Sequence, residues 1–284
     1  MTVVVGFVGA DGAVMASDSE ATESGGLTRY DVEKIWTCGR LMMGYTGTSS
    51  VKQPLETALE KGVVGLFGAR AEIDRDQARA ALRQATAEVL VACYQFHVGA
   101  RDAHQVPEAL KGVLLVIGRD AKGYWMLEID WMAQATFYTD NGFHTVGSGA
   151  PAAYVAQSLM REYEPAGRAV ADLKLIAYRT VQNCIDSMGG GLGVGGHVQL
   201  WYSESNGPFV KAAQQEIERV ESGVEQWRGI ERESLSQVVL GGAPQPEGVP
   251  LPELPAEIAD AKPPEDEEPD NEDPPKAEGH QRSQ

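Results

Sequence analysis

Thr2 stands directly behind the initiator methionine, where it could become the first residue of the mature chain. Methionine aminopeptidase acts when the second residue is small, so we expect Met1 to be removed. A free N-terminal threonine carries a hydroxyl and an α-amine on one residue. The amine has an ordinary pKa of about 7.7–8, which suits a general base at neutral pH. Thr2 could therefore act as a nucleophile that its own amine activates.

Two charged residues follow Thr2 at spacings that could place them beside it. Asp18 comes sixteen residues later, across one tight hairpin, so a returning strand can bring it level with the N-terminus. Lys34 begins a later strand. A buried Lys34 ammonium near the amine would lower the pKa of that amine, and Asp18 would keep the lysine charged and oriented. Plainer alternatives remain open: an ordinary strand residue for Thr2, a strand-end cap for Asp18 and a surface cation for Lys34.

The first half of the chain must supply the strands that carry these residues. Runs of β-branched and apolar residues, separated by turn signals, predict hairpins in the first fifty residues. Apolar residues at helical spacing then predict two helices. The expected strands are Thr2–Val8, Ala13–Ala16, Lys34–Thr37 and Leu41–Tyr45, and the expected helices are Ser49–Lys61 and Asp74–Cys93.

The second half repeats this order of strands followed by helices. The expected strands are Val113–Gly118, Tyr124–Leu127, Phe137–Tyr138, His144–Val146 and Val198–Tyr202, and the expected helices are Ala152–Tyr163, Val170–Ser187 and Phe209–Val238. An apolar stripe along the last helix must dock on the domain or on a neighbouring subunit. The order predicts an α+β fold, a four-layer α/β/β/α sandwich of two antiparallel sheets flanked by helices.

The charge of the chain is unevenly distributed. The 284 residues include 41 acidic and 24 basic ones, a formal net charge of −17. Residues 241–284 hold 12 of the acidic residues, 3 of the basic ones and 10 of the 15 prolines. Such a segment cannot bury enough apolar surface to offset its chain entropy. We therefore expect one folded domain at 1–240, with its C-terminal helix at 209–238, and a disordered acidic tail at 241–284.

Composition also excludes several classes of function. Phosphates would repel so acidic a chain, so we expect no nucleic-acid partner and no membrane partner. No apolar run approaches the ~18–20 residues that span a bilayer, and the N-terminus lacks the basic region of a signal peptide. Cys38, Cys93 and Cys184 are too far apart for a disulfide framework or a zinc site, which favours free thiols in a reducing cytoplasm. The five histidines lack metal-ligand spacing, so we expect neither a metal nor a cofactor.

The N-terminal motifs resemble those of proteasome β-type subunits and of the bacterial HslV-type peptidase. The resemblance covers roughly Thr2 to Tyr202 and is strongest in the first fifty residues. The matching segments are Thr2, Ala16-Ser17-Asp18 with Ala21-Thr22, Asp31-Val32-Glu33-Lys34-Ile35, Thr46-Gly47 and the later Val146-Gly147-Ser148-Gly149. This resemblance implies the fold of the N-terminal nucleophile (Ntn) hydrolases.

The resemblance also implies a role for each matching residue. Thr2 would be the nucleophile and, through its amine, the general base, while Lys34 would tune that amine and Asp18 would hold Lys34. The backbone N–H of Gly47 would stabilise the oxyanion, and Ser148 would complete the hydrogen bonds around the amine. Thr22 would align an extended substrate as an added strand. Asp186, ahead of a glycine-rich loop longer than the family pattern, would stand for the carboxylate after the fourth helix.

The implied activity is that of a threonine-type endopeptidase that works inside a self-compartmentalised ring. Its partners would be copies of itself, peptide or unfolded-protein substrates, and an ATPase or adaptor that binds the acidic tail. Two alternatives remain open: a ring-forming subunit without catalysis, and an Ntn amidohydrolase that acts on a small-molecule amide.

Overall fold

The structure is a computed structural model that describes residues 2–23, 28–67, 73–98, 111–159, 167–188 and 194–239. The chain divides into two compact units, Met1–Glu233 and Ser234–Gln284. The first unit contains both large sheets and most of the helical residues. The expected tail, 241–284, lies outside the described residues, so the boundary at residue 240 stays a prediction.

Two five-stranded sheets form the centre of the first unit, and every strand pair in them is antiparallel. The first sheet has the order β10-β1-β2-β11-β12, with bounds Phe143–Val146, Val4–Val8, Gly12–Asp18, Val198–Glu204 and Val210–Lys211. The second has the order β5-β6-β7-β8-β9, with bounds Ile35–Cys38, Leu41–Thr46, Val113–Asp120, Gly123–Ile129 and Ala135–Phe137. A separate two-stranded ribbon pairs β3 (Glu20–Glu23) with β4 (Thr28–Asp31).

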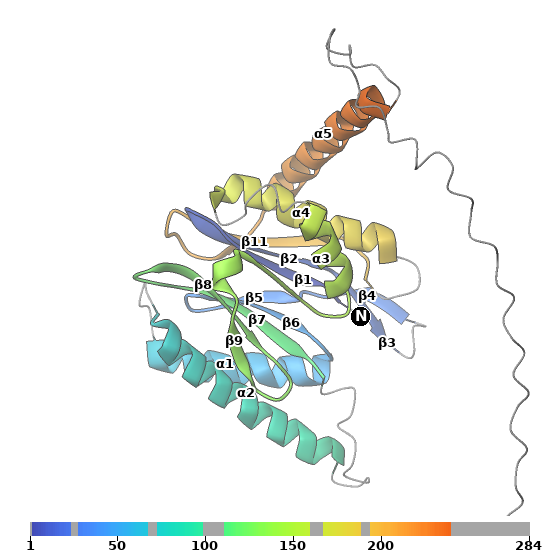
Figure 1. The fold of residues 1–284 in the computed structure, drawn as a ribbon. Coiled ribbons are helices and arrows are strands. Elements are labelled where there is room, and N and C mark those ends of the chain that lie inside the picture. The colour runs from blue at the N-terminus through green and yellow to red at the C-terminus, as the bar shows by residue number, and fades with distance from the viewer. Residues whose placement is uncertain are drawn as a thin grey trace, which may run out of the picture. The chain divides into compact units, whose positions relative to one another are not determined.

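Helices cover the outer face of each sheet (Figure 1). The helices are α1 (Ser49–Phe67), α2 (Arg75–Val98), α3 (Ala150–Leu159), α4 (Val170–Met188) and α5 (Gln214–Val239), with a short 3-10 helix η3 at Thr139–Asn141. In Figure 1, α3 and α4 lie above the first sheet, and α1 and α2 lie below the second. The predicted four-layer α/β/β/α sandwich is therefore confirmed.

Strand β1 shows how the sequence builds these layers. Successive side chains of a strand point to opposite faces of its sheet. Val5 and Phe7 belong to the apolar cluster that includes α3 and α4, whereas Val4 and Val8 belong to the cluster between the two sheets. Because both faces of β1 are covered, its run of apolar residues does not alternate with polar ones, and the first residues of the chain are held in the interior.

The last helix begins later than the sequence pattern predicts. The apolar run suggested a helix over 209–238, but α5 starts at Gln214. Val210 and Lys211 instead pair with β11 as the edge strand β12. The backbone carbonyl of Ala213 then accepts the first helical hydrogen bonds, from Glu216 and Ile217. Pairing with an open sheet edge thus overrides the helical period at this point.

The apolar stripe of α5 docks on the domain itself, against α4. Val220 and Val224 are buried in the same cluster as the inner face of α4. Beside them, the Arg179 guanidinium donates two hydrogen bonds to the Glu231 carboxylate and lies 4.1 Å from the centre of the Trp227 ring. A bidentate pair of this kind fixes the orientation of one helix on the other.

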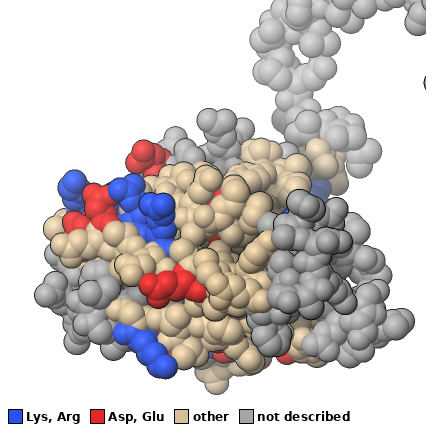
Figure 2. Space-filling view, turned by 90° about the horizontal axis from the view of Figure 1, so that it is seen from below, with Lys and Arg blue, Asp and Glu red and all other residues tan. Residues whose placement is uncertain are grey.

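The described surface mixes charges of both signs. On the face seen in Figure 2, Lys and Arg side chains lie among Asp and Glu side chains and a larger uncharged area. Among the described helices, none combines the length and the apolar character that crossing a membrane requires.

Candidate active site

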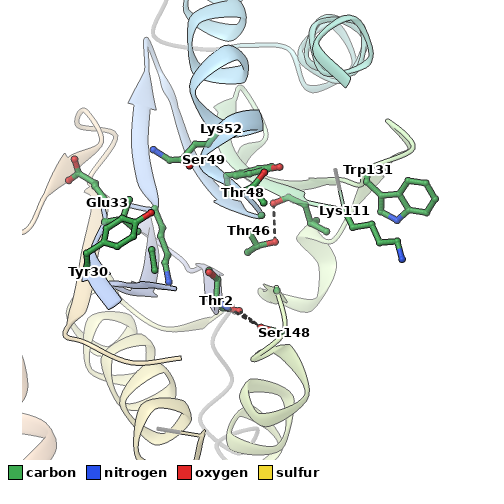
Figure 3. Close-up of a pocket in the computed structure, with 17 residues that line it drawn as sticks. Thr2, Tyr30, Glu33, Thr46, Thr48, Ser49, Lys52, Lys111, Trp131 and Ser148 are labelled. Atoms are coloured by element: carbon green, nitrogen blue, oxygen red, sulfur yellow. Dashed lines mark hydrogen bonds between the residues drawn. The ribbon is translucent and has the colours of Figure 1, made fainter. Parts of the chain in front are cut away.

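A cavity of about 830 Å³ opens at the N-terminal end of β1. Its walls come from the ends of β6 and β4, the start of α1, the start of β7 and the loop between β10 and α3. The lining residues labelled in Figure 3 are Thr2, Tyr30, Glu33, Thr46, Thr48, Ser49, Lys52, Lys111, Trp131 and Ser148. Lys34 and Gly47 line the same cavity.

Thr2 is held in this cavity by the loop that precedes α3 (Figure 3). Its backbone nitrogen donates to the Ser148 hydroxyl at 3.0 Å, and its carbonyl accepts from the backbone N–H of Gly149 at 3.1 Å. In the 284-residue chain this nitrogen is a peptide amide. Removal of Met1 would turn it into an amine at the same place, beside the same hydroxyl.

Gly147 makes this close approach possible. Its φ of +100° is a conformation that residues with a side chain rarely adopt. A Cβ at this position would lie 2.2 Å from the carbonyl oxygen of Thr2, well inside van der Waals contact. The glycine before Ser148 is therefore required for the loop to pass next to the N-terminus.

Asp18 and Lys34 form a buried ion pair beneath the cavity. Lys34 Nζ lies 2.7 Å from Asp18 Oδ2, and the two side chains are 4% and 0% exposed. The other carboxylate oxygen accepts the backbone N–H of Val3 at 2.8 Å, and Oδ2 also accepts that of Gly195 at 3.2 Å. Lys34 Nζ donates a further bond to the carbonyl of Glu20 at 2.7 Å. A buried pair is stable only with such additional hydrogen bonds, which fix both groups in place.

Burial lowers the pKa of Lys34 below its ordinary value of 10.5, because the charged form loses hydration. The Asp18 carboxylate acts in the opposite direction and restores part of that loss. Lys34, held in this way, lines the same cavity as Thr2.

Gly47 lines the cavity, whereas Thr22 is not among its lining residues. Gly47 follows β6 with a φ of +152°, and a Cβ there would meet the Tyr45 hydroxyl at 2.5 Å. Thr22 lies on β3, opposite Arg29 of β4. Among the described strands β3 pairs with β4 alone. The Glu20 N–H already donates to the Gly195 carbonyl and the Glu20 carbonyl accepts from Lys34 Nζ, so an added strand could pair with β3 only beyond Glu20, at Thr22. Ala21, the neighbour of Thr22, lines the cavity.

Asp186 is a second candidate, after Thr22, that does not line the cavity. It lies on α4, where its oxygens accept hydrogen bonds from Gln182 at 2.7 Å and Arg228 at 3.2 Å. It is absent from the residues that line the cavity. The geometry thus gathers Thr2, Lys34, Gly47 and Ser148 around one space, with Asp18 behind Lys34, and leaves Asp186 on the α4–α5 surface.

Several lining residues carried no signal in the sequence. Tyr30, Lys52, Lys111 and Trp131 belong to no motif, and they reach the cavity only because β4, α1, β7 and the turn after β8 converge there. Within the described part of the chain, no group of three or more His, Cys, Asp or Glu side chains is arranged to hold a metal ion.

The layers and the position of the N-terminus define the fold as a proteasome-like Ntn-hydrolase fold. A solved structure with this fold is that of an Anbu protein, a Gly-1 mutant from Hyphomicrobium sp. strain MC1. The match has a TM-score of 0.62 and 14% sequence identity, and it covers 84% of this chain and 97% of that one. No protein-family model matches the sequence, and no curated protein matches it either.

These comparisons correct the family assignment that the motifs suggested. Assigning the chain to the proteasome β-type subunits and HslV-type peptidases is wrong, because no family model matches and the structural match is to Anbu. At 14% identity this match establishes the fold and leaves the activity to be argued from the site.

Proposed function

We propose that the protein is a threonine-type endopeptidase whose nucleophile is Thr2 after removal of Met1. The observation that carries the proposal is the position of the Thr2 nitrogen, 3.0 Å from the Ser148 hydroxyl in a cavity that Lys34 also lines. A scaffold protein has no need of a buried ion pair whose lysine lines the same cavity as its N-terminal residue. Keeping Lys34 and Asp18 out of water has a cost in stability, and catalysis gives a reason for it.

The proposed reaction proceeds through an acyl-enzyme. The Thr2 amine takes the proton of the Thr2 hydroxyl as the oxygen attacks the scissile carbonyl. The Gly47 N–H stabilises the oxyanion of the tetrahedral intermediate, which collapses as the amine passes its proton to the leaving nitrogen. Water, activated by the same amine, then hydrolyses the Thr2 ester and restores the hydroxyl.

The part of the β3 edge at Thr22, beyond the Glu20 backbone that Gly195 and Lys34 already bind, favours a peptide as the substrate. An extended peptide added to this edge would pass the Ala21–Thr22 segment and present its carbonyl to Thr2, with side chains entering the cavity. A substrate bound by its backbone in this way must be a peptide rather than a small amide.

The proposal is tested by replacing the nucleophile. Thr2→Ala should abolish turnover of a fluorogenic peptide, whereas Thr2→Ser should keep part of it, because a hydroxyl and an amine remain. Thr136→Ala, an exposed position on β9, is the matched control and should keep full activity. Intact mass should show the loss of Met1. Active protein that retains Met1, or an active Thr2→Ala variant, would contradict the mechanism.

We also propose that copies of the chain form a closed ring with the cavities facing an inner chamber. Large apolar side chains are exposed on separate elements of the first unit, including Val91, Met132, Val155 and Ile230, and each is available for a contact between copies. Light scattering at micromolar concentration should give a multiple of the 30.5 kDa chain. A monomer would instead favour an amidohydrolase of small amides, which needs no enclosed chamber.

A further inference from the structure

Gln199 is a buried polar residue one strand away from the Asp18–Lys34 pair. It lies on β11, opposite Ser17 of β2, and is 5% exposed. Its side chain leaves the sheet and reaches the segment between β4 and β5. The amide nitrogen donates to the carbonyl of Val32 at 2.9 Å, and the amide oxygen accepts the backbone N–H of Lys34 at 3.1 Å.

These two bonds substitute for a strand partner. Residues 32–34 lie between two strands and belong to neither, so no ladder pairs the carbonyl of Val32 or the N–H of Lys34. Lys34 is buried and Val32 is half-buried, and backbone groups removed from water require hydrogen-bond partners. One carboxamide supplies both, since it can donate and accept at the same time. The backbone of Lys34 is thereby tied to the first sheet at the residue that carries the ammonium.

The same side chain is also hydrogen-bonded to the residue that precedes Asp18. The Ser17 hydroxyl donates to the Gln199 amide oxygen at 3.4 Å, and Ser17 directly precedes Asp18. Gln199 therefore joins the strand that presents Asp18 to the segment that presents Lys34. A site of this kind needs its groups held within about 0.5 Å by a supporting layer of contacts.

We propose that Gln199 is a positioning residue for the nucleophile, which holds the Lys34 backbone so that the ammonium stays beside the Thr2 amine. This inference rests on the proposed function of Thr2. The charged groups that influence the pKa of Lys34 are Asp18 and Glu20, and both raise it. Loosening the Lys34 backbone would let the ammonium move toward water, and the amine would then bind its proton more tightly.

The test replaces Gln199 by Met, which has a similar length but makes neither hydrogen bond. The readout is the rate at which cyanate carbamylates the N-terminal amine between pH 5 and 10, in full-length protein prepared to begin at Thr2. Because only the free base reacts, this rate gives the pKa of the amine without any substrate. In Gln199→Met we expect this pKa to rise by about 0.5 unit or more, which lowers the free-base fraction, and with it the rate, about threefold at pH values well below the pKa.

Ser203→Ala is the matched control, on the same strand. Its hydroxyl is buried and contacts the Tyr124 hydroxyl and the Gly207 carbonyl, far along β11 from Gln199. This variant should lose a comparable amount of stability while its amine titrates as in the wild type. If Gln199→Met is folded and its amine titrates as in the wild type, or shifts only as much as in Ser203→Ala, the proposal is overturned.

A second variant covers the case in which Gln199→Met does not fold. Ionised Glu in Gln199→Glu keeps an acceptor for the Lys34 N–H but cannot donate to the Val32 carbonyl. The pKa of the amine should again rise, and the acidic limb of the kcat/KM profile should follow it. An unchanged amine titration in this variant would also overturn the proposal. A wild-type protein that cleaves no peptide, combined with the expected titration shifts, overturns the peptidase function and leaves the role of Gln199 standing.

Discussion

At the scale of single residues, the site depends on where one cation is placed. Lys34 is buried and held by Asp18 and by the Glu20 carbonyl, and it lines the cavity that contains Thr2. An ammonium near an amine disfavours its protonation, so the amine stays a free base at a lower pH. The direction of this effect gives the first prediction.

Lys34→Met should raise the pKa of the Thr2 amine and move the acidic limb of the kcat/KM profile to higher pH. At pH 7 the loss should be about 10²-fold or more, the usual contribution of a general base. Because Asp18 is left buried without its cation, stability should fall by about 3–5 kcal/mol, and adding Asp18→Asn should restore part of it.

Lys174→Met provides the control for that experiment. Lys174 is also a buried lysine, paired with Glu216 and placed over the Tyr202 ring, but it does not line the cavity. Its loss should change stability and leave the pH profile unaltered. A folded Lys34→Met protein with the wild-type profile would refute the assignment of Lys34.

A second prediction concerns the reactivity of the buried cysteine thiols. Burial raises the pKa of Cys38 to about 11 and that of Cys184 to about 12. At pH 8 the thiolate fraction is then about a thousandth and about a ten-thousandth, compared with about a tenth for an ordinary thiol. Iodoacetamide at pH 8 should leave both unmodified in the native protein and alkylate them in urea. Rapid native alkylation of Cys184 would show that the inner face of α4, which carries this residue, is not packed against the first sheet as described.

At the scale of elements, the N-terminal hairpin was predictable and its surroundings were less so. The turn at Asp11–Gly12 and the apolar runs on either side predict β1 and β2, which places Thr2 and Asp18 together. The ribbon of β3 and β4 carries no comparable apolar pattern, because it pairs outside both large sheets. Local patterning therefore did not predict its contribution to the cavity through Tyr30, and only the family resemblance pointed to the Ala21–Thr22 segment.

The hydrogen bonds of Gln199 to Val32 and Lys34 could not be predicted from the sequence for a different reason. Nothing in its neighbourhood on β11 distinguishes a glutamine that faces solvent from one that reaches across to another segment. The distinction depends on the register in which Gln199 pairs with Ser17. Such a register is set by the whole sheet and not by local spacing.

The prediction at the scale of elements concerns Gly147, in the loop between β10 and α3. Gly147→Ala should reduce peptide cleavage at least about tenfold and stability by about 1–3 kcal/mol, because φ is +100° and the new Cβ would meet the Thr2 carbonyl. Gly62→Ala on α1 is the control, since a Cβ there meets nothing within 4 Å. It should leave activity intact and add about 0.5–1 kcal/mol of stability. Urea unfolding and initial rates measure both variants, and equal behaviour of the two would contradict the described loop.

At the scale of the whole molecule, charge and fold separate along the chain. Residues 241–284 contribute −9 of the net charge of −17 and two thirds of the prolines. The buried clusters that hold the sheets together draw their residues from the chain up to Trp227. Acidic, proline-rich segments do not form cores of their own. Folding and catalysis should therefore depend on the residues before 241, and electrostatic association with a partner should depend on residues 241–284.

Deleting residues 241–284 tests this separation. The free energy of unfolding, the assembly state and the rate of peptide cleavage should all stay within error of the full-length protein. A second deletion, from Gln214 onward, is the contrasting control, because it removes Val220 and Val224 from their contact with α4 and should destabilise the domain.

If the tail recruits a basic partner, the shorter deletion should also abolish co-purification of that partner at low salt, since screening weakens exposed charge pairs. Retained co-purification would mean that the tail only adds solubility. If the shorter deletion prevents assembly or unfolds the protein, the predicted domain boundary at residue 240 is wrong.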